Sequence, residues 1–145
     1  MPGAEIETLI RLRKFEVDEH HRKMAVLLRR EETVIRGLDA LAEEKEAETT
    51  FMKSAGIWEG LTFAAYLEHW ELRHQQFIDA LKKVRGDIEK VRDELSDAYR
   101  RLKTFEITKE NRDFEKNREE NRLEQIDLDE MGLDLYRRRN DARLL

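Results

Sequence analysis

Hydrophobic residues in the second half of the chain recur with alternating steps of four and three, from Phe63 to Phe105, and only His74 interrupts the series. A spacing of about 3.5 residues is typical of the seam of a coiled coil and not of a strand. The pattern therefore predicts a long helix. We call these positions the second-helix seam: Phe63, Leu67, Trp70, His74, Phe77, Leu81, Val84, Ile88, Val91, Leu95, Ala98, Leu102 and Phe105.

A weaker form of the same pattern runs through the first third of the chain. Acidic residues precede basic ones by one helical turn, as Asp18 precedes Arg22, which supports a solvated helix face. The pattern predicts a first helix over about residues 5–49. Its seam comprises Ile10, Val17, Met24 and Leu38 at one heptad position, where Glu31 is the exception, and Leu27, Val34 and Leu41 three residues further on, flanked by Leu28 and Ile35.

The segment between the two patterns predicts a bend at about residues 50–60. It contains Gly56 and Gly60, and glycine ends helices and admits positive φ. Two long amphipathic helices joined by a short loop fold back on each other as an antiparallel hairpin. We therefore expect an all-α fold, a two-helix antiparallel coiled-coil hairpin that forms one domain over residues 1–145.

The second helix is expected to outrun the first. A first helix of about 45 residues reaches roughly 70 Å, whereas a second helix over about residues 61–138 reaches roughly 115 Å. Residues beyond about Glu106 then have no partner within the chain. Leu123, Ile126 and Leu133 resume the seam there. An apolar stripe of this kind has to be buried against another surface. Either the helix bends back or another protein covers it, and we favour the partner.

Composition excludes several classes of protein and of functional site. Charged residues make up 42% of the chain, cysteine is absent, and acidic and basic residues are interleaved around a net charge of −5. The absence of cysteine excludes disulfides, zinc–thiolate sites and thiol nucleophiles. There is no basic stripe for nucleic acid, and the longest apolar run, Met24–Leu28, is far too short to span a bilayer. A cytoplasmic helical protein is expected.

No catalytic or metal-binding motif is present in the sequence. None of the four histidines pairs with another at the i,i+4 spacing of a helical metal site, and no glycine-rich phosphate loop or nucleophile elbow occurs. Carboxylates on solvated helices lack the desolvated pocket that catalysis requires. We expect no enzymatic activity, no cofactor and no metal.

Aromatic residues concentrate near the predicted bend. Phe63, Trp70 and Phe77 lie on the seam and can cap the coiled coil, whereas Trp58 and Tyr66 lie off it. Aromatic side chains at an exposed position make good interface anchors. Both interpretations remain open, and Trp58 and Tyr66 are the better candidates for contact with a partner.

One C-terminal segment carries a family resemblance. Glu120–Glu130 reads ENRLEQIDLDE and resembles the E-N-R-x-(D/E)-Q-x-x-x-D-E segment of the flagellar export protein family FliJ. Residues 9–16, LIRLRKFE, resemble the start of that family's first helix, and Leu102-Lys103 followed by Phe105 resembles the middle of its second. The expected hairpin with a longer C-terminal helix also agrees with the family.

The resemblance implies a component of the flagellar type III export apparatus that is similar to the central stalk of rotary ATPases. Its terminal end would insert into the hexameric export ATPase FliI and promote its assembly and activity. The other end would contact the export gate protein FlhA. The ATPase regulator FliH and export chaperones are further implied partners, nucleic acid is not, and the implied location is cytoplasmic, peripheral to the inner membrane at the flagellar basal body.

Carried onto this chain, the resemblance implies two groups of contact residues. The ATPase-ring contact comprises Arg13, Asn121, Arg122, Gln125, Asp129 and Glu130, to which the apolar stripe adds Leu123 and Ile126. The export-gate contact comprises Tyr66, Trp70 and Phe77, with Trp58 beside them. Two alternatives remain: the homologous stalk protein of an injectisome, and a self-associating coiled-coil scaffold whose C-terminal helices pair in an antiparallel dimer.

Overall fold

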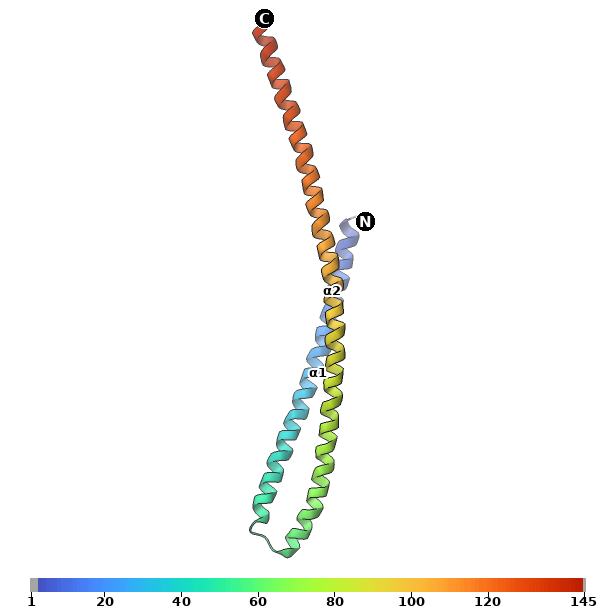
Figure 1. Cartoon of the computed structure of the whole chain (residues 1–145), viewed down its shortest axis with the longest axis vertical. Coiled ribbons are helices and arrows are strands. Elements are labelled where there is room, and N and C mark those ends of the chain that lie inside the picture. Colours follow the sequence, from blue (N-terminus) through green and yellow to red (C-terminus); the bar gives the residue numbers. More distant parts are fainter. Residues whose placement is uncertain (1–2, 145) are drawn as a thin grey trace. The chain divides into compact units, whose positions relative to one another are not determined.

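The computed structural model describes residues 3–144 and contains two helices, α1 (Gly3–Met52) and α2 (Ile57–Leu144) (Figure 1). The predicted all-α hairpin is confirmed, and no strand occurs in the described part of the chain. None of the described helices has the length and apolar character that crossing a membrane requires.

The chain divides into two compact units. The bend unit, Lys14–Tyr99, contains most of α1, the bend and the first half of α2. The terminal unit joins the described residues up to Arg13 with those from Arg100 onward. The two helices lie side by side in each unit, and the contacts below belong to one unit at a time.

The core of the bend unit is a single apolar seam between the helices. Leu27 of α1 packs against Val84, Ile88 and Val91 of α2, with Met24 and Leu81 at the margin. All thirteen positions of the second-helix seam are buried or half-buried in the two units, so the heptad prediction is confirmed. The periodicity works because residues three and four apart share one face of a helix, and that face is the one that meets α1.

A glycine of α1 makes room for an aromatic ring of the facing helix. A Cβ atom added at Gly37 would lie 2.8 Å from Cζ of Phe77 and would also clash with Cε1 of that ring. Phe77 therefore packs directly on the backbone of α1. The close approach depends on the absence of a side chain at residue 37.

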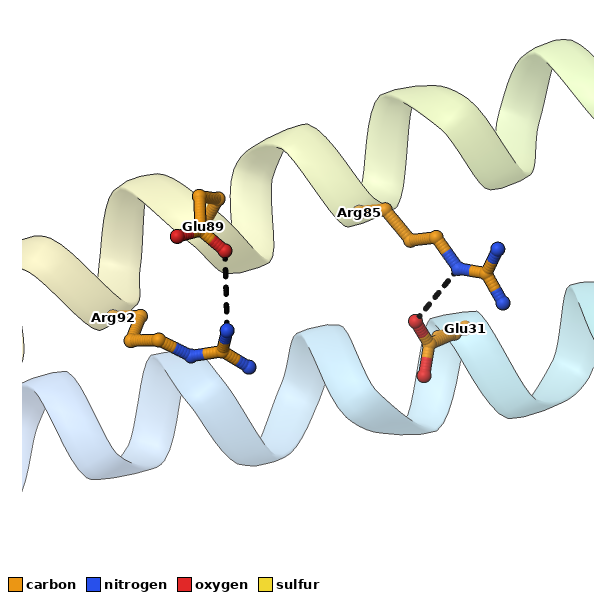
Figure 2. A network of polar contacts seen from close by, with 4 residues as sticks. All are labelled: Glu31, Arg85, Glu89 and Arg92. Carbon is orange, nitrogen blue, oxygen red and sulfur yellow. Dashed lines mark hydrogen bonds and ion pairs between the residues drawn. The ribbon is translucent and has the colours of Figure 1, made fainter.

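Polar residues occupy a few seam positions, and each has a partner across or along the seam. The carboxylate of Glu31 lies 3.3 Å from Nε of Arg85 on α2, and Figure 2 shows this pair beside the intrahelical pair of Glu89 and Arg92. Nδ1 of His20 lies 3.4 Å from the carboxylate of Glu94. Such pairs favour one register of the two helices over others.

The bend is shorter than predicted and occupies the four residues Lys53–Gly56. The amides of Lys53, Ser54 and Ala55 donate hydrogen bonds to carbonyls three residues earlier, which closes the last turn of α1. Trp58 and Gly60 belong to the first turn of α2 and not to the loop. No described residue, glycine included, has positive φ, so the bend does not use the left-handed conformation that glycine admits.

In the terminal unit, α1 pairs with only a short part of α2. Ile6 and Ile10 are buried against α2, where Leu102 is buried as well. The ion pair of Lys109 with Glu7, at 3.3 Å, still joins the two helices about one turn beyond the predicted end of pairing. From this point α2 continues alone past the start of α1 (Figure 1).

Candidate interaction surfaces

The part of α2 that follows Glu110, residues 111–144, is the first candidate surface, and we call it the overhang. Every residue from 111 to 139 is exposed. Leu123 and Ile126 retain 49% and 40% of their accessible surface, although a hydrophobic side chain normally gains about 1.5–3 kcal/mol when it is buried. Large apolar side chains exposed along this segment are Phe114, Leu123, Ile126, Leu128, Met131, Leu133, Leu135 and Tyr136.

These apolar side chains do not form one stripe. At 3.6 residues per turn, Leu123, Ile126 and Leu133 project to one side of α2. Leu128, Met131 and Leu135 project to the opposite side by the same geometry. The overhang thus offers hydrophobic surface on opposing faces, whereas a helix that packs on one neighbour has a single apolar face.

Several polar residues of the overhang are held by pairs within the helix. The guanidinium of Arg122 donates two hydrogen bonds to the carboxylate of Glu119, at 3.1 Å from Nε and 2.6 Å from Nη2. This bidentate bond lowers the pKa of Glu119 and raises the pKa of Arg122. The side-chain amide of Gln125 donates to Oδ1 of Asp129 at 3.0 Å. Three of the predicted ring-contact residues are therefore pre-oriented on the helix surface.

Arg13 is not brought to the rest of the predicted ring contact. Its guanidinium lies over the ring of Phe105, 5.6 Å from the centroid, and the residue is half-buried. About 24 Å of α2 separates Phe105 from Asn121 at 1.5 Å per residue. Asn121 and Glu130 are exposed on the overhang with the other predicted residues.

The second candidate surface lies at the bend. Phe51, Ile57, Trp58 and Leu61 are all exposed there, and the indole of Trp58 retains 81% of its accessible surface. The ring of Tyr66 is half-buried and stacks on that of Phe63, with centroids 6.0 Å apart. Exposed aromatic and aliphatic side chains from both helices therefore gather around the four-residue loop.

Two of the four predicted gate-contact residues lie instead between the helices. Trp70 is buried, and its Nε1–H donates a hydrogen bond to the carbonyl of Leu41 at 2.8 Å. Phe77 is half-buried against Gly37. Trp58 and Tyr66 are the members of the predicted set that reach the bend surface.

Electrostatic potential at the bend is shaped by carboxylates. Burial of the Tyr66 hydroxyl and the nearby negative charge of Glu44 raise the pKa of Tyr66, and Glu48 adds to the effect. Arg73, which is paired with Glu44 at 2.9 Å, opposes it. Among the described residues no three metal-ligating side chains gather into one cluster.

The sequence did not single out several residues of these surfaces. Glu119, which fixes Arg122, precedes the family-like segment by one residue, and its i,i+3 spacing to Arg122 is the signal that would have found it. Ile57 lies in the predicted loop and Leu61 at the predicted start of the second helix, and the seam pattern, which begins at Phe63, includes neither of them. Their exposure follows from the way the two helix ends meet.

The family comparison decides the assignment. A protein-family model described as "Flagellar FliJ protein" matches residues 3–141, which is nearly the whole chain. The chain belongs to the flagellar FliJ family. No curated protein and no solved structure matches it. As a FliJ-family chain it has a role related to flagellar export, within a family of non-catalytic export components.

Proposed function

We propose that this FliJ-family chain is the stalk of the hexameric export ATPase. The overhang inserts into the ring and promotes its assembly and activity, and the bend surface contacts the export gate protein. The protein then acts in the cytoplasm, peripheral to the inner membrane at the flagellar basal body. The ATPase regulator and the export chaperones are further partners that the family assignment favours.

The observation that carries this proposal is the distribution of apolar side chains on the overhang. Leu123 and Ile126 face one side of α2, and Leu128 and Met131 face the other. A single partner helix covers one face and leaves the opposite face in water. A ring interior surrounds the helix and can bury both faces at once.

The polar residues of the overhang are compatible with insertion. The charge of Arg122 is already matched by Glu119, and the amide of Gln125 is matched by Asp129. Burial of an unpaired charge costs several kcal/mol, and a pre-formed bidentate pair avoids much of that cost. The overhang can therefore enter a ring without a separate ring residue for each of its charges.

The test is an ATPase assay of the cognate export ATPase with the double variant Leu123→Asp with Ile126→Asp. We expect loss of stimulation with an unchanged circular-dichroism melting curve, because both side chains are exposed in the free chain. The matched control is Leu28→Asp with Leu72→Asp, which adds the same charge at exposed positions of the bend unit and keeps stimulation. Intact stimulation together with melting at a lower temperature in the first variant would show that the overhang is internal core.

A further inference from the structure

A cavity of about 330 Å³ opens at the bend, and we call it the bend pocket. This volume lies near the lower end of the range of ligand pockets, about 300–1,000 Å³. The end of α1 and the first turns of α2 supply its walls, all within the bend unit. The lining residues are Glu48, Phe51, Met52, Trp58, Glu59, Thr62, Phe63 and Tyr66.

Aromatic rings dominate the walls of the bend pocket. Trp58 and Phe51 are exposed, with 81% and 63% of their surface accessible, and Phe63 and Tyr66 are stacked behind them. The face of an aromatic ring carries a partial negative charge, and it attracts ammonium and guanidinium groups within about 6 Å. The walls alone therefore favour a cation with an aliphatic stem.

The carboxylates of the pocket are those of Glu48 and Glu59. Within the described residues neither Glu48 nor Glu59 forms an ion pair, whereas the nearby Glu44 is paired with Arg73. Glu48 stands in the last turns of α1 and Glu59 in the first turn of α2, so the two acids come from both sides of the bend. Burial of its hydroxyl is the main cause of the raised pKa of Tyr66, and the negative charges of Glu44 and Glu48 add to it.

We propose that the bend pocket receives a lysine or arginine side chain of a partner protein, inserted between the aromatic rings and neutralised by Glu48 and Glu59. The exposed side chains of Ile57 and Leu61 continue the surface beside the pocket, so the partner segment carries apolar residues next to the cation. The same chemistry already occurs within the chain, where Nζ of Lys45 lies 4.2 Å from the ring centroid of Trp70.

This inference rests on the proposed contact of the bend with the export gate and adds the chemistry of the residue that is recognised. Charge complementarity selects the occupant: an acidic segment would meet two uncompensated carboxylates, and a neutral apolar segment would leave both of them without a partner. Desolvation of an unmatched carboxylate disfavours both of these occupants.

The test uses nuclear magnetic resonance of the whole chain with three capped tripeptides as probes. They have the sequences Leu-Arg-Leu, Leu-citrulline-Leu and Leu-Glu-Leu, and citrulline has the shape of arginine without its charge. The chain has two tryptophans, so the indole N–H signal of Trp58 reports the pocket and that of Trp70 serves as the internal control. We expect the arginine peptide to shift the Trp58 signal, with about fivefold or greater preference over citrulline.

A charge variant tests whether these two carboxylates, and not the overall negative charge of the chain, bind the arginine peptide. Glu48→Gln with Glu59→Gln should weaken binding of the arginine peptide by about fivefold and remove its preference over citrulline. The matched control, Glu46→Gln with Glu68→Gln, changes the net charge equally at exposed positions that do not line the pocket and should keep the preference.

Equal affinity for arginine and citrulline, tighter binding of the glutamate peptide, or an unmoved Trp58 signal with every probe would each overturn the inference. The comparison of peptides on the unaltered chain does not depend on whether the variants fold. It also needs no gate protein, so it can fail while binding of the gate's cytoplasmic domain persists. Conversely, absence of gate binding with a clear arginine preference contradicts the gate contact and leaves the chemistry of the pocket intact.

Discussion

At the scale of single residues, Gly37 lies where the ring of Phe77 meets the backbone of α1. In most helices a change from glycine to alanine stabilises the helix by about 1 kcal/mol. Here the added methyl group overlaps the ring edge, so the ring must move out of the seam and lose packing. We expect Gly37→Ala to lower the free energy of unfolding by about 1–2 kcal/mol, measured by urea denaturation.

Gly86 provides the matched control for this prediction. It lies in the same unit, is exposed on α2, and a Cβ atom added there has no neighbour within 4 Å. Gly86→Ala should therefore raise the free energy of unfolding by about 0.5–1 kcal/mol. Stabilisation by both substitutions would show that the ring of Phe77 does not require the open backbone.

Tyr66 gives the bend unit a dependence on alkaline pH. Its pKa in the folded chain is raised by burial and by Glu44, whereas in the unfolded chain it titrates near its ordinary value of about 10. Above this pH the unfolded state loses the proton first, so the free energy of unfolding falls as the pH rises through about 10. At neutral pH both states are protonated and the group contributes nothing to this dependence.

Tyr66→Phe should remove this contribution. Between about pH 8 and pH 11 the unfolding free energy of the unaltered chain should fall relative to that of the variant. Urea denaturation at the two pH values gives this difference, and a near-ultraviolet absorbance titration locates the delayed ionisation. A difference that is constant with pH would contradict the shift.

At the scale of whole helices, the overhang and the part of α2 that packs on α1 differ in how much they contribute to the free energy of unfolding. Residues 111–139 are all exposed, so they add little to the cooperative unfolding of the rest. A chain that ends after Glu110 should keep its free energy of unfolding within about 0.5 kcal/mol. A chain that ends after Ala98 loses Leu102 and Phe105 and should be clearly destabilised.

Urea denaturation followed by circular dichroism measures both truncations. A loss well above 1 kcal/mol on removal of the overhang alone would mean that it packs back on the hairpin. The truncation after Ala98 is the positive control, because it removes residues that pack on α1 and should lower the free energy of unfolding.

The seam was predictable because it is a local property of a helix. Every seventh position returns to the same face, so Val84, Val91 and Ala98 could be placed together before any contact was known. Ile6 was missed, although it precedes Leu27 by three heptads, because Arg13 and His20 occupy the intervening positions. Their partners, Phe105 and Glu94, explain why the seam accepts polar residues there.

The bend and the surface at the bend could be predicted only in part. Gly60 suggested a loop, yet it lies in α2, where a helix can tolerate glycine at a cost of about 1 kcal/mol. The seam pattern predicts the burial of Trp70, but the hydrogen bond from its indole to the carbonyl of Leu41 is a contact between helices that no local pattern encodes. The exposure of Trp58 likewise depends on where the two helix ends meet.

At the scale of the whole molecule, the stalk and the scaffold interpretations differ in mass. Stalk insertion needs a free overhang, so the isolated chain should have a mass of 17.4 kDa in multi-angle light scattering. The scaffold requires twice that mass, with the C-terminal helices paired. A dimer that Leu123→Asp with Ile126→Asp converts to a monomer would favour the scaffold, because a paired overhang buries this face.

The exposed overhang also has a consequence for the lifetime of the protein. A helix without neighbours unwinds locally at little cost, and a protease needs such an unwound segment to reach its cleavage site. Arg112, Arg118 and Lys116 place tryptic sites within this segment. A protease should cleave unassembled chains first within the overhang. Chains whose overhang is bound in a complex should resist this cleavage. Turnover would then remove the copies that have not been assembled.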